Sequence, residues 1–261
     1  LYMADSLREI TIEDDYFDAN DNLIENRFFE VDEYGCLYEY NTDGGRVLLR
    51  MPSKNEAKDM VGNIITKFTF SNVFEIGVNA FRNVVNLEEI ELPGAVWRTE
   101  SGMTIVGYEK NELLGSSENY NALFEGCENL KSVKILENVV DGTKITDRCF
   151  ANCPKLETIV LTEGFVSVGK ESFYNNAMVE LVIPDTVRYI SEKAITNCPN
   201  LETIVLSKAV TSLEGGEKII SNLNSLKYIT LPYLISDIPS SFIERCPLLE
   251  EYILPEGFAS Y

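Results

Sequence analysis

The hexapeptide Leu-Glu-Thr-Ile-Val-Leu occupies residues 156–161 and returns unchanged at residues 201–206. A related unit, with apolar residues at its first, fourth and sixth positions, begins at eight anchor residues: Leu7, Leu87, Leu130, Leu156, Met178, Leu201, Leu226 and Leu249. The last five intervals between anchors are 26, 22, 23, 25 and 23 residues. A period in the twenties predicts a stack of similar structural units, each of which buries its apolar face against its neighbours.

Each unit combines a short strand with a second apolar pattern upstream of it. In the strand we expect positions 1, 4 and 6 to point into the core and positions 2, 3 and 5 to point outward. Proline follows the sixth position in several units and stops the ladder there, at Pro93, Pro184, Pro232 and Pro255. Upstream, one column predicts a buried spine within short helical or 3₁₀ turns: Phe81, Phe124, Phe150, Phe173, Ile195, Ile220 and Ile243.

These patterns predict an α/β, strand-rich leucine-rich-repeat solenoid, curved, with short parallel strands and short helical or 3₁₀ turns. We expect one domain over residues 1–261, with an acidic segment and a hairpin at about 13–60. Leu87 and Leu130 are 43 residues apart, so an excursion from the solenoid is expected at about 94–121. Both ends of the sequence fall inside a repeat, which predicts a fragment of a longer chain.

The repeat resembles that of BspA-like leucine-rich-repeat proteins, which carries Ile-Gly, Ala-Phe, Asn-Cys and Leu-x-x-Ile-x-Leu-Pro in this order. Residues 73–93 follow the order closely, from Ile76-Gly77 through Ala80-Phe81 to Leu92-Pro93. The resemblance covers roughly residues 64–261. It extends to a hairpin at 29–52, in which residues 31–38 would pair with residues 47–49 across Asp43-Gly44-Gly45.

That family is mostly bacterial and surface-exposed, and members are associated with adhesion to host proteins or to other cells. The resemblance therefore implies a non-enzymatic, cell-surface or secreted scaffold that recognises a host or neighbouring-cell protein through protein–protein interaction. Three other classes stay open: a glycan-binding module, a purely structural surface spacer and a hydrolase. Repeat periodicity alone selects none of them, because fold does not fix function.

Composition excludes several kinds of chemistry. The chain has no histidine, which excludes histidine-dependent triads and metal hydrolysis. A net charge of −20 disfavours nucleic acid and anionic membranes as partners, and no apolar run is long enough for membrane insertion. Four of six cysteines share one repeat column and are interpreted as small buried apolar residues. We expect no metal and no cofactor: residues 18–29 lack the glycine and glutamate of an EF-hand, and Glu171 replaces the hydroxyl residue of a P-loop.

The candidate binding residues lie on the outward sheet face and on the excursion. At strand position 5, consecutive repeats carry Val160, Val182 and Val205, which would form an apolar stripe. Position 3 adds Thr158, Thr203 and Tyr228, and the excursion adds the aromatic residues Trp97, Tyr108 and Tyr120. Simpler interpretations stay open, because valine favours strands in general and loop aromatics can pack back on the core.

Overall fold

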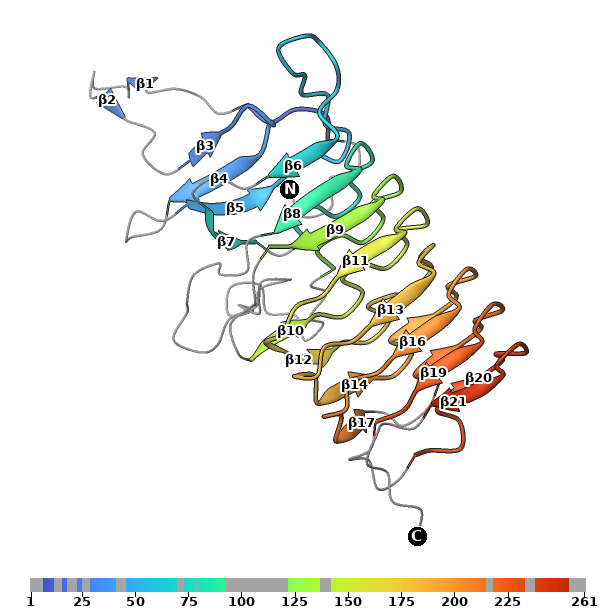
Figure 1. Cartoon of the computed structure of the whole chain (residues 1–261). Helices are drawn as coiled ribbons and strands as arrows, with labels where there is room; N and C mark the ends of the chain where they lie inside the picture. Colours follow the sequence, from blue (N-terminus) through green and yellow to red (C-terminus); the bar gives the residue numbers. More distant parts are fainter. Residues whose placement is uncertain are drawn as a thin grey trace.

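A computed structural model describes residues 7–11, 16–17, 23–24, 29–40, 46–69, 73–77, 79–92, 122–136, 142–214, 218–232 and 238–253. The described residues form a strand-rich solenoid whose repeats follow one another in a single row (Figure 1). The fold class expected from the sequence is confirmed: short parallel strands dominate the repeats.

The anchor-containing strands build two parallel sheets. One has the order β11-β9-β8-β6 and comprises β6 (Lys67–Thr69), β8 (Glu89–Leu92), β9 (Ser132–Ile135) and β11 (Thr158–Val160). The other has the order β13-β16-β19-β21 and comprises β13 (Glu180–Val182), β16 (Thr203–Val205), β19 (Tyr228–Thr230) and β21 (Glu251–Ile253). β11 and β13 follow each other in the row, but the ladder is interrupted between them (Figure 1).

The remaining turns of each repeat contribute two more parallel sheets. One has the order β10-β12-β14-β17 and comprises β10 (Thr143–Ile145), β12 (Phe165–Val168), β14 (Tyr189–Ser191) and β17 (Ser212–Glu214). The other has the order β15-β18-β20 and comprises the two-residue strands β15 (Ile195–Thr196), β18 (Ile220–Ser221) and β20 (Ile243–Glu244). A repeat in this part of the chain therefore adds one short strand to each of three sheets.

An N-terminal sheet joins the hairpin region to the solenoid. Its order is β3-β4-β5-β7, and its strands are β3 (Phe29–Val31), β4 (Leu37–Tyr40), β5 (Arg46–Arg50) and β7 (Val73–Ile76). β4 and β5 are antiparallel and pair Tyr38 with Leu48, whereas β5 and β7 are parallel. A separate antiparallel pair consists of β1 (Tyr16–Phe17) and β2 (Leu23–Ile24).

The predicted division into inward and outward positions is confirmed in the repeats anchored at Met178 and Leu201. Leu201, Ile204 and Leu206 of one repeat are at most 1% exposed, and Met178, Leu181 and Ile183 of the preceding repeat are equally buried. The parallel register places Leu181 beside Ile204 and Ile204 beside Ile229. Each repeat therefore stacks its apolar side chains directly on those of the next, which is why the repeats depend on one another for burial.

The predicted spine is also confirmed. Phe81, Phe124, Phe150 and Phe173 are fully buried, and consecutive rings are nearly parallel with centroids 5.3, 5.5 and 5.7 Å apart. Ile195 and Ile220 continue the column at 0% exposure, and Ile243 is half-buried. Offset aromatic stacking at such separations adds to the stabilisation from burial itself.

The turns around the spine differ from the expectation of short helices or 3₁₀ turns. In the described ranges they are hydrogen-bonded turns and two-residue strands, with no helix. Most repeats place two residues four apart in the left-handed region, as at Lys193 and Asn197, both with φ of 56°. Such residues interrupt a right-handed helix, and the spine amides bond across repeats: the Phe150 N–H donates to the Ser172 carbonyl at 2.9 Å.

Candidate binding surface

The three stripe valines lie on consecutive strands of the outward sheet face. Val160 is 48% exposed and Val182 is 49% exposed, whereas Val205 is half-buried. Val182 and Val205 are direct partners in the ladder between β13 and β16. Val160 ends β11, on the other side of the interruption in the ladder. The structure therefore presents two strongly exposed valines and one partly covered valine along this face.

Polar residues border the stripe at strand position 3. Glu180 pairs with Thr203, and Thr203 pairs with Tyr228 in the next strand. Thr158 and Glu180 are exposed, whereas Thr203 and Tyr228 are half-buried. An apolar strip bordered by polar side chains is the pattern found at protein contact sites.

The same face is charged in the repeats nearer the N-terminus. Lys67 lies 3.5 Å from Glu89 and 3.6 Å from Glu91, and Lys134 lies 4.0 Å from Glu91. These pairs neutralise one another within the sheet. Exposed ion pairs of this kind contribute little to stability. They make the surface beside β11 polar, with its charges paired within the sheet.

Val179 is a further exposed apolar residue that the sequence analysis did not nominate. It is 54% exposed and immediately precedes β13. Its strand position is occupied by charged residues in the other repeats, as at Glu157, Glu202 and Lys227. The sequence alone shows this difference between repeats. The exposed Val179 side chain enlarges the apolar area around Val182. Tyr252 of β21 is also 54% exposed, although its ladder partner Ile229 is buried.

The three aromatic residues nominated on the excursion, Trp97, Tyr108 and Tyr120, lie outside the described residues, as does most of the acidic segment. The segment with P-loop-like spacing is described. Residues Phe165–Val168 form strand β12, as the repeat register predicts, so no phosphate-binding loop exists there.

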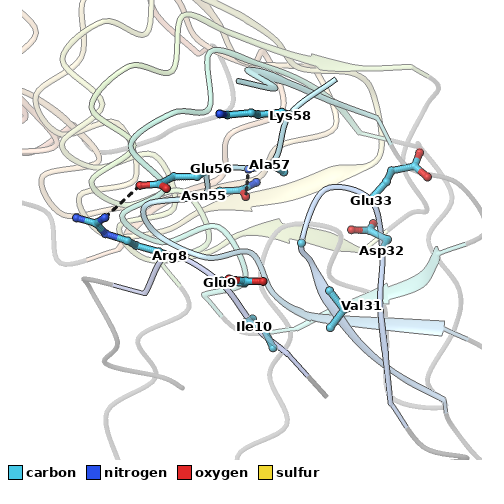
Figure 2. A pocket seen from close by; sticks show the side chains of 11 residues that line it. Arg8, Glu9, Ile10, Val31, Asp32, Glu33, Asn55, Glu56, Ala57 and Lys58 are labelled. Atoms are coloured by element: carbon cyan, nitrogen blue, oxygen red, sulfur yellow. Dashed lines mark hydrogen bonds and ion pairs between the residues drawn. The ribbon is translucent and has the colours of Figure 1, made fainter. Parts of the chain in front are cut away.

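A polar cleft of about 530 Å³ lies at the N-terminal end of the described chain (Figure 2). Segments 8–10, 31–35 and 55–58 line it, and Arg8 lies 3.4 Å from Glu56 across its wall. Asp32 points its carboxylate into the adjoining turn, where Oδ1 accepts the Cys36 N–H at 2.9 Å and Oδ2 accepts the Tyr38 hydroxyl at 2.7 Å. The Asp32 carboxylate is therefore occupied in holding the hairpin.

All six cysteines are free thiols, and four occupy the repeat column identified in the sequence. The thiols of Cys127, Cys153 and Cys198 each donate to a spine carbonyl one repeat earlier, at 3.0–3.1 Å. Burial raises the pKa of Cys127 and of Cys198 to about 12. These thiols act as buried packing groups that also cross-link neighbouring repeats through hydrogen bonds.

We expect one thiol of the native protein to react with Ellman's reagent at pH 8. Burial raises the pKa of Cys246 as well, but its thiol is only half-buried, whereas the other five are buried and inaccessible to the reagent. Denaturation should release all six. The substitution Cys246→Ser should remove the fast native reaction, and a fast reaction that persists in this variant would contradict the assignment.

Among the described residues, no group of three or more cysteine, aspartate or glutamate side chains is arranged to hold a metal ion. Within the same ranges, no helix has the length and apolar character that crossing a bilayer requires.

Comparisons with known proteins agree with the repeat architecture. A family model described as the BspA type leucine rich repeat region matches six copies, over residues 61–104 and 143–260. No curated protein matches this chain. Families built from such repeats are typically non-catalytic.

Solved structures are also similar. A leucine-rich repeat protein from Bacteroides ovatus is 23% identical, with a TM-score of 0.62, over 87% of this chain and 53% of its own length, so this chain spans about half of that protein. A leucine rich cell surface protein from Faecalibacterium prausnitzii is 13% identical over 90% of this chain and 96% of its own, with a TM-score of 0.30. The pneumococcal vaccine antigen PcpA is 16% identical over 88% and 48%, with a TM-score of 0.43.

The family model covers more than half of the sequence, including the repeats anchored at Met178 and Leu201. The chain therefore belongs to the BspA-type leucine-rich-repeat family.

Proposed function

We propose that this chain is a non-enzymatic protein-binding scaffold of the cell surface or of a secreted protein, and that it recognises a host or neighbouring-cell protein. The contact surface is the sheet face around Val160, Val182 and Val205, bordered by Thr158, Thr203 and Tyr228. The aromatic residues Trp97, Tyr108 and Tyr120 are secondary candidates.

The observation that carries the proposal is the exposure of Val160 in β11, Val182 in β13 and Val179 just before β13, at 48%, 49% and 54%. Rigid strands hold these side chains in place, so a partner can cover them without the entropic cost of ordering a loop. The setting at the cell surface and the adhesive role rest on the family, whose members are mostly surface-exposed.

The test is a binding screen of the purified chain against immobilised extracellular-matrix and host-cell surface proteins, with and without calcium. In a saturable hit, Val182→Glu should abolish binding while the melting temperature stays nearly unchanged, because a carboxylate at the contact would be desolvated without a partner. A matched control is Val61→Glu, which introduces the same charge at a residue that is 81% exposed and lies before β6.

Equal affinity of Val182→Glu and the unsubstituted chain would refute the valine surface as the contact. Equal loss in both glutamate variants would attribute the effect to added negative charge rather than to this face. Silence across the protein panel would overturn the adhesive role itself.

A further inference from the structure

One row of side chains on the outward sheet face alternates in charge from repeat to repeat. The row consists of the residues that immediately precede β8, β9, β11, β13, β16, β19 and β21, namely Glu88, Lys131, Glu157, Val179, Glu202, Lys227 and Glu250. Acid and base alternate on both sides of Val179, so the pattern calls for a cation at this position. The side chain found there is apolar, and it is 54% exposed.

Each of the two lysines in the row lies between two glutamates. Lys131 Nζ donates to the Glu88 carboxylate at 2.8 Å, and Lys227 Nζ donates to the Glu202 carboxylate at 2.8 Å. The pKa of Lys131 is raised by its hydrogen bond to Glu88 and also by the charge of Glu157 in the next repeat. The row is therefore a chain of charge contacts that runs from one repeat to the next.

A backbone contact is also missing at the position of the valine. In the regular repeats, the carbonyl of the residue in this row accepts two N–H groups from the next repeat, as the Val179 carbonyl does at 2.8 and 3.3 Å. The Glu157 carbonyl accepts none from the repeat that follows it. The Ala177 N–H donates instead to the Leu156 carbonyl at 3.1 Å. The anchor interval here is 22 residues, the shortest of the last five, which shifts the backbone out of register.

The carboxylates at this boundary carry charge that the chain itself does not neutralise. Glu180 makes no ion pair with any described residue, and Glu157 makes none within 4.0 Å in the same part of the chain. Of the two neighbouring lysines, Lys134 belongs to the paired surface beside β11, and Lys155 Nζ donates to Asn129 Oδ1 at 2.6 Å. The boundary therefore presents negative charge directly beside exposed valines.

We propose that the protein partner supplies the cation that the row lacks, from an arginine or lysine side chain placed over Val179. Its charged group binds the Glu157 and Glu180 carboxylates, while its hydrocarbon stem packs against the valine. Apolar residues of the partner on either side of this cation cover Val160 and Val182. This inference rests on the proposed protein contact and adds the chemistry of the partner, which is a basic residue flanked by apolar ones.

The charge pattern of the row can be tested in the chain alone. Val179→Lys should melt at least about 1 °C above Val179→Glu at low salt, because opposite charges on neighbouring strands stabilise a sheet and like charges destabilise it. The difference should shrink in about 1 M NaCl, since salt screens exposed charges. Equal melting temperatures of the two variants at low salt would contradict the vacant cation position.

The chemistry of the partner is tested by selecting binders to the immobilised chain from a displayed library of random peptides. We expect the enriched peptides to carry arginine or lysine next to apolar residues, and to lose binding to Val182→Glu. For a selected synthetic peptide, Val179→Lys should weaken binding at least about tenfold, because the new ammonium fills the site. Val179→Gln removes the valine without adding charge and should weaken binding less than about threefold.

The control is Val61→Lys, which adds the same charge at a residue that is 81% exposed and lies before β6. It should change the affinity less than about twofold. Failure to enrich any peptide, equal loss in Val61→Lys and Val179→Lys, or basic peptides that still bind Val182→Glu would overturn the proposal. Enriched peptides that need Val182 but carry no basic residue would overturn the missing cation and leave the proposed protein contact standing.

Discussion

Phe150→Ala should lower the free energy of unfolding by about 3–5 kcal/mol, the range for removing a large aromatic ring from a core. Phe150 is fully buried, and its ring stacks on Phe124 at 5.5 Å and on Phe173 at 5.7 Å. The substitution leaves a cavity between two repeats and removes stacking on both sides. Because each repeat is stabilised chiefly by its neighbours, the loss should be seen in urea denaturation of the whole chain.

Tyr189→Ala is the matched control for Phe150→Ala. Tyr189 is an aromatic residue in β14 that is 40% exposed, and its truncation should cost less than about 1 kcal/mol, as for most surface substitutions. Phe150→Ile should cost less than Phe150→Ala, because Ile195 and Ile220 fill the same column in later repeats. A change of under about 1 kcal/mol in Phe150→Ala would contradict the role of the spine as the core of the stack.

Glu125→Ala should destabilise the protein by about 2–3 kcal/mol. The Glu125 side chain is 11% exposed and neutralises Arg82 and Arg148, which are 26% and 24% exposed. Removing one partner of a buried ion pair costs about 3–5 kcal/mol because the other charge is left desolvated. The arginines here keep some access to water, which lowers the expected cost.

The control for Glu125→Ala is Glu88→Ala. Glu88 lies 2.8 Å from Lys131, but both side chains are more exposed, at 37% and 50%. We therefore expect a loss of about 0–1 kcal/mol from Glu88→Ala in the same urea titration. Equal losses in the two variants would show that Glu125 contributes no more than a surface ion pair.

Much of the fold could be predicted because the repeat imposes the same constraint on each strand. Leu201, Ile204 and Leu206 are buried as their spacing predicts, and the aromatic column is a continuous stack. The candidate stripe followed from the same spacing. The spacing did not predict how exposed each valine is: Val160 and Val182 are exposed, whereas Val205 is half-buried.

The turns were harder to predict. Short helical or 3₁₀ turns were expected around the spine, yet the backbone enters the left-handed region at residues such as Lys193 and Arg148, which carry no glycine signal. The hydrogen bonds between repeats compensate for this conformation, as when the Phe173 N–H donates to the Ala194 carbonyl at 2.9 Å. These hydrogen bonds join different repeats, so the sequence of a single repeat does not reveal them.

The sequence by itself determined the period, the inward columns, the spine and the family, because a repeated apolar spacing allows one way of stacking. Only the tertiary structure revealed the interrupted ladder between β11 and β13, and the shared use of Glu125 by Arg82 and Arg148. It also showed that Glu244 is shared in the same way by Lys218 and Arg245. Such contacts join residues of different repeats, and their partners depend on side-chain reach across the stack rather than on spacing along the chain.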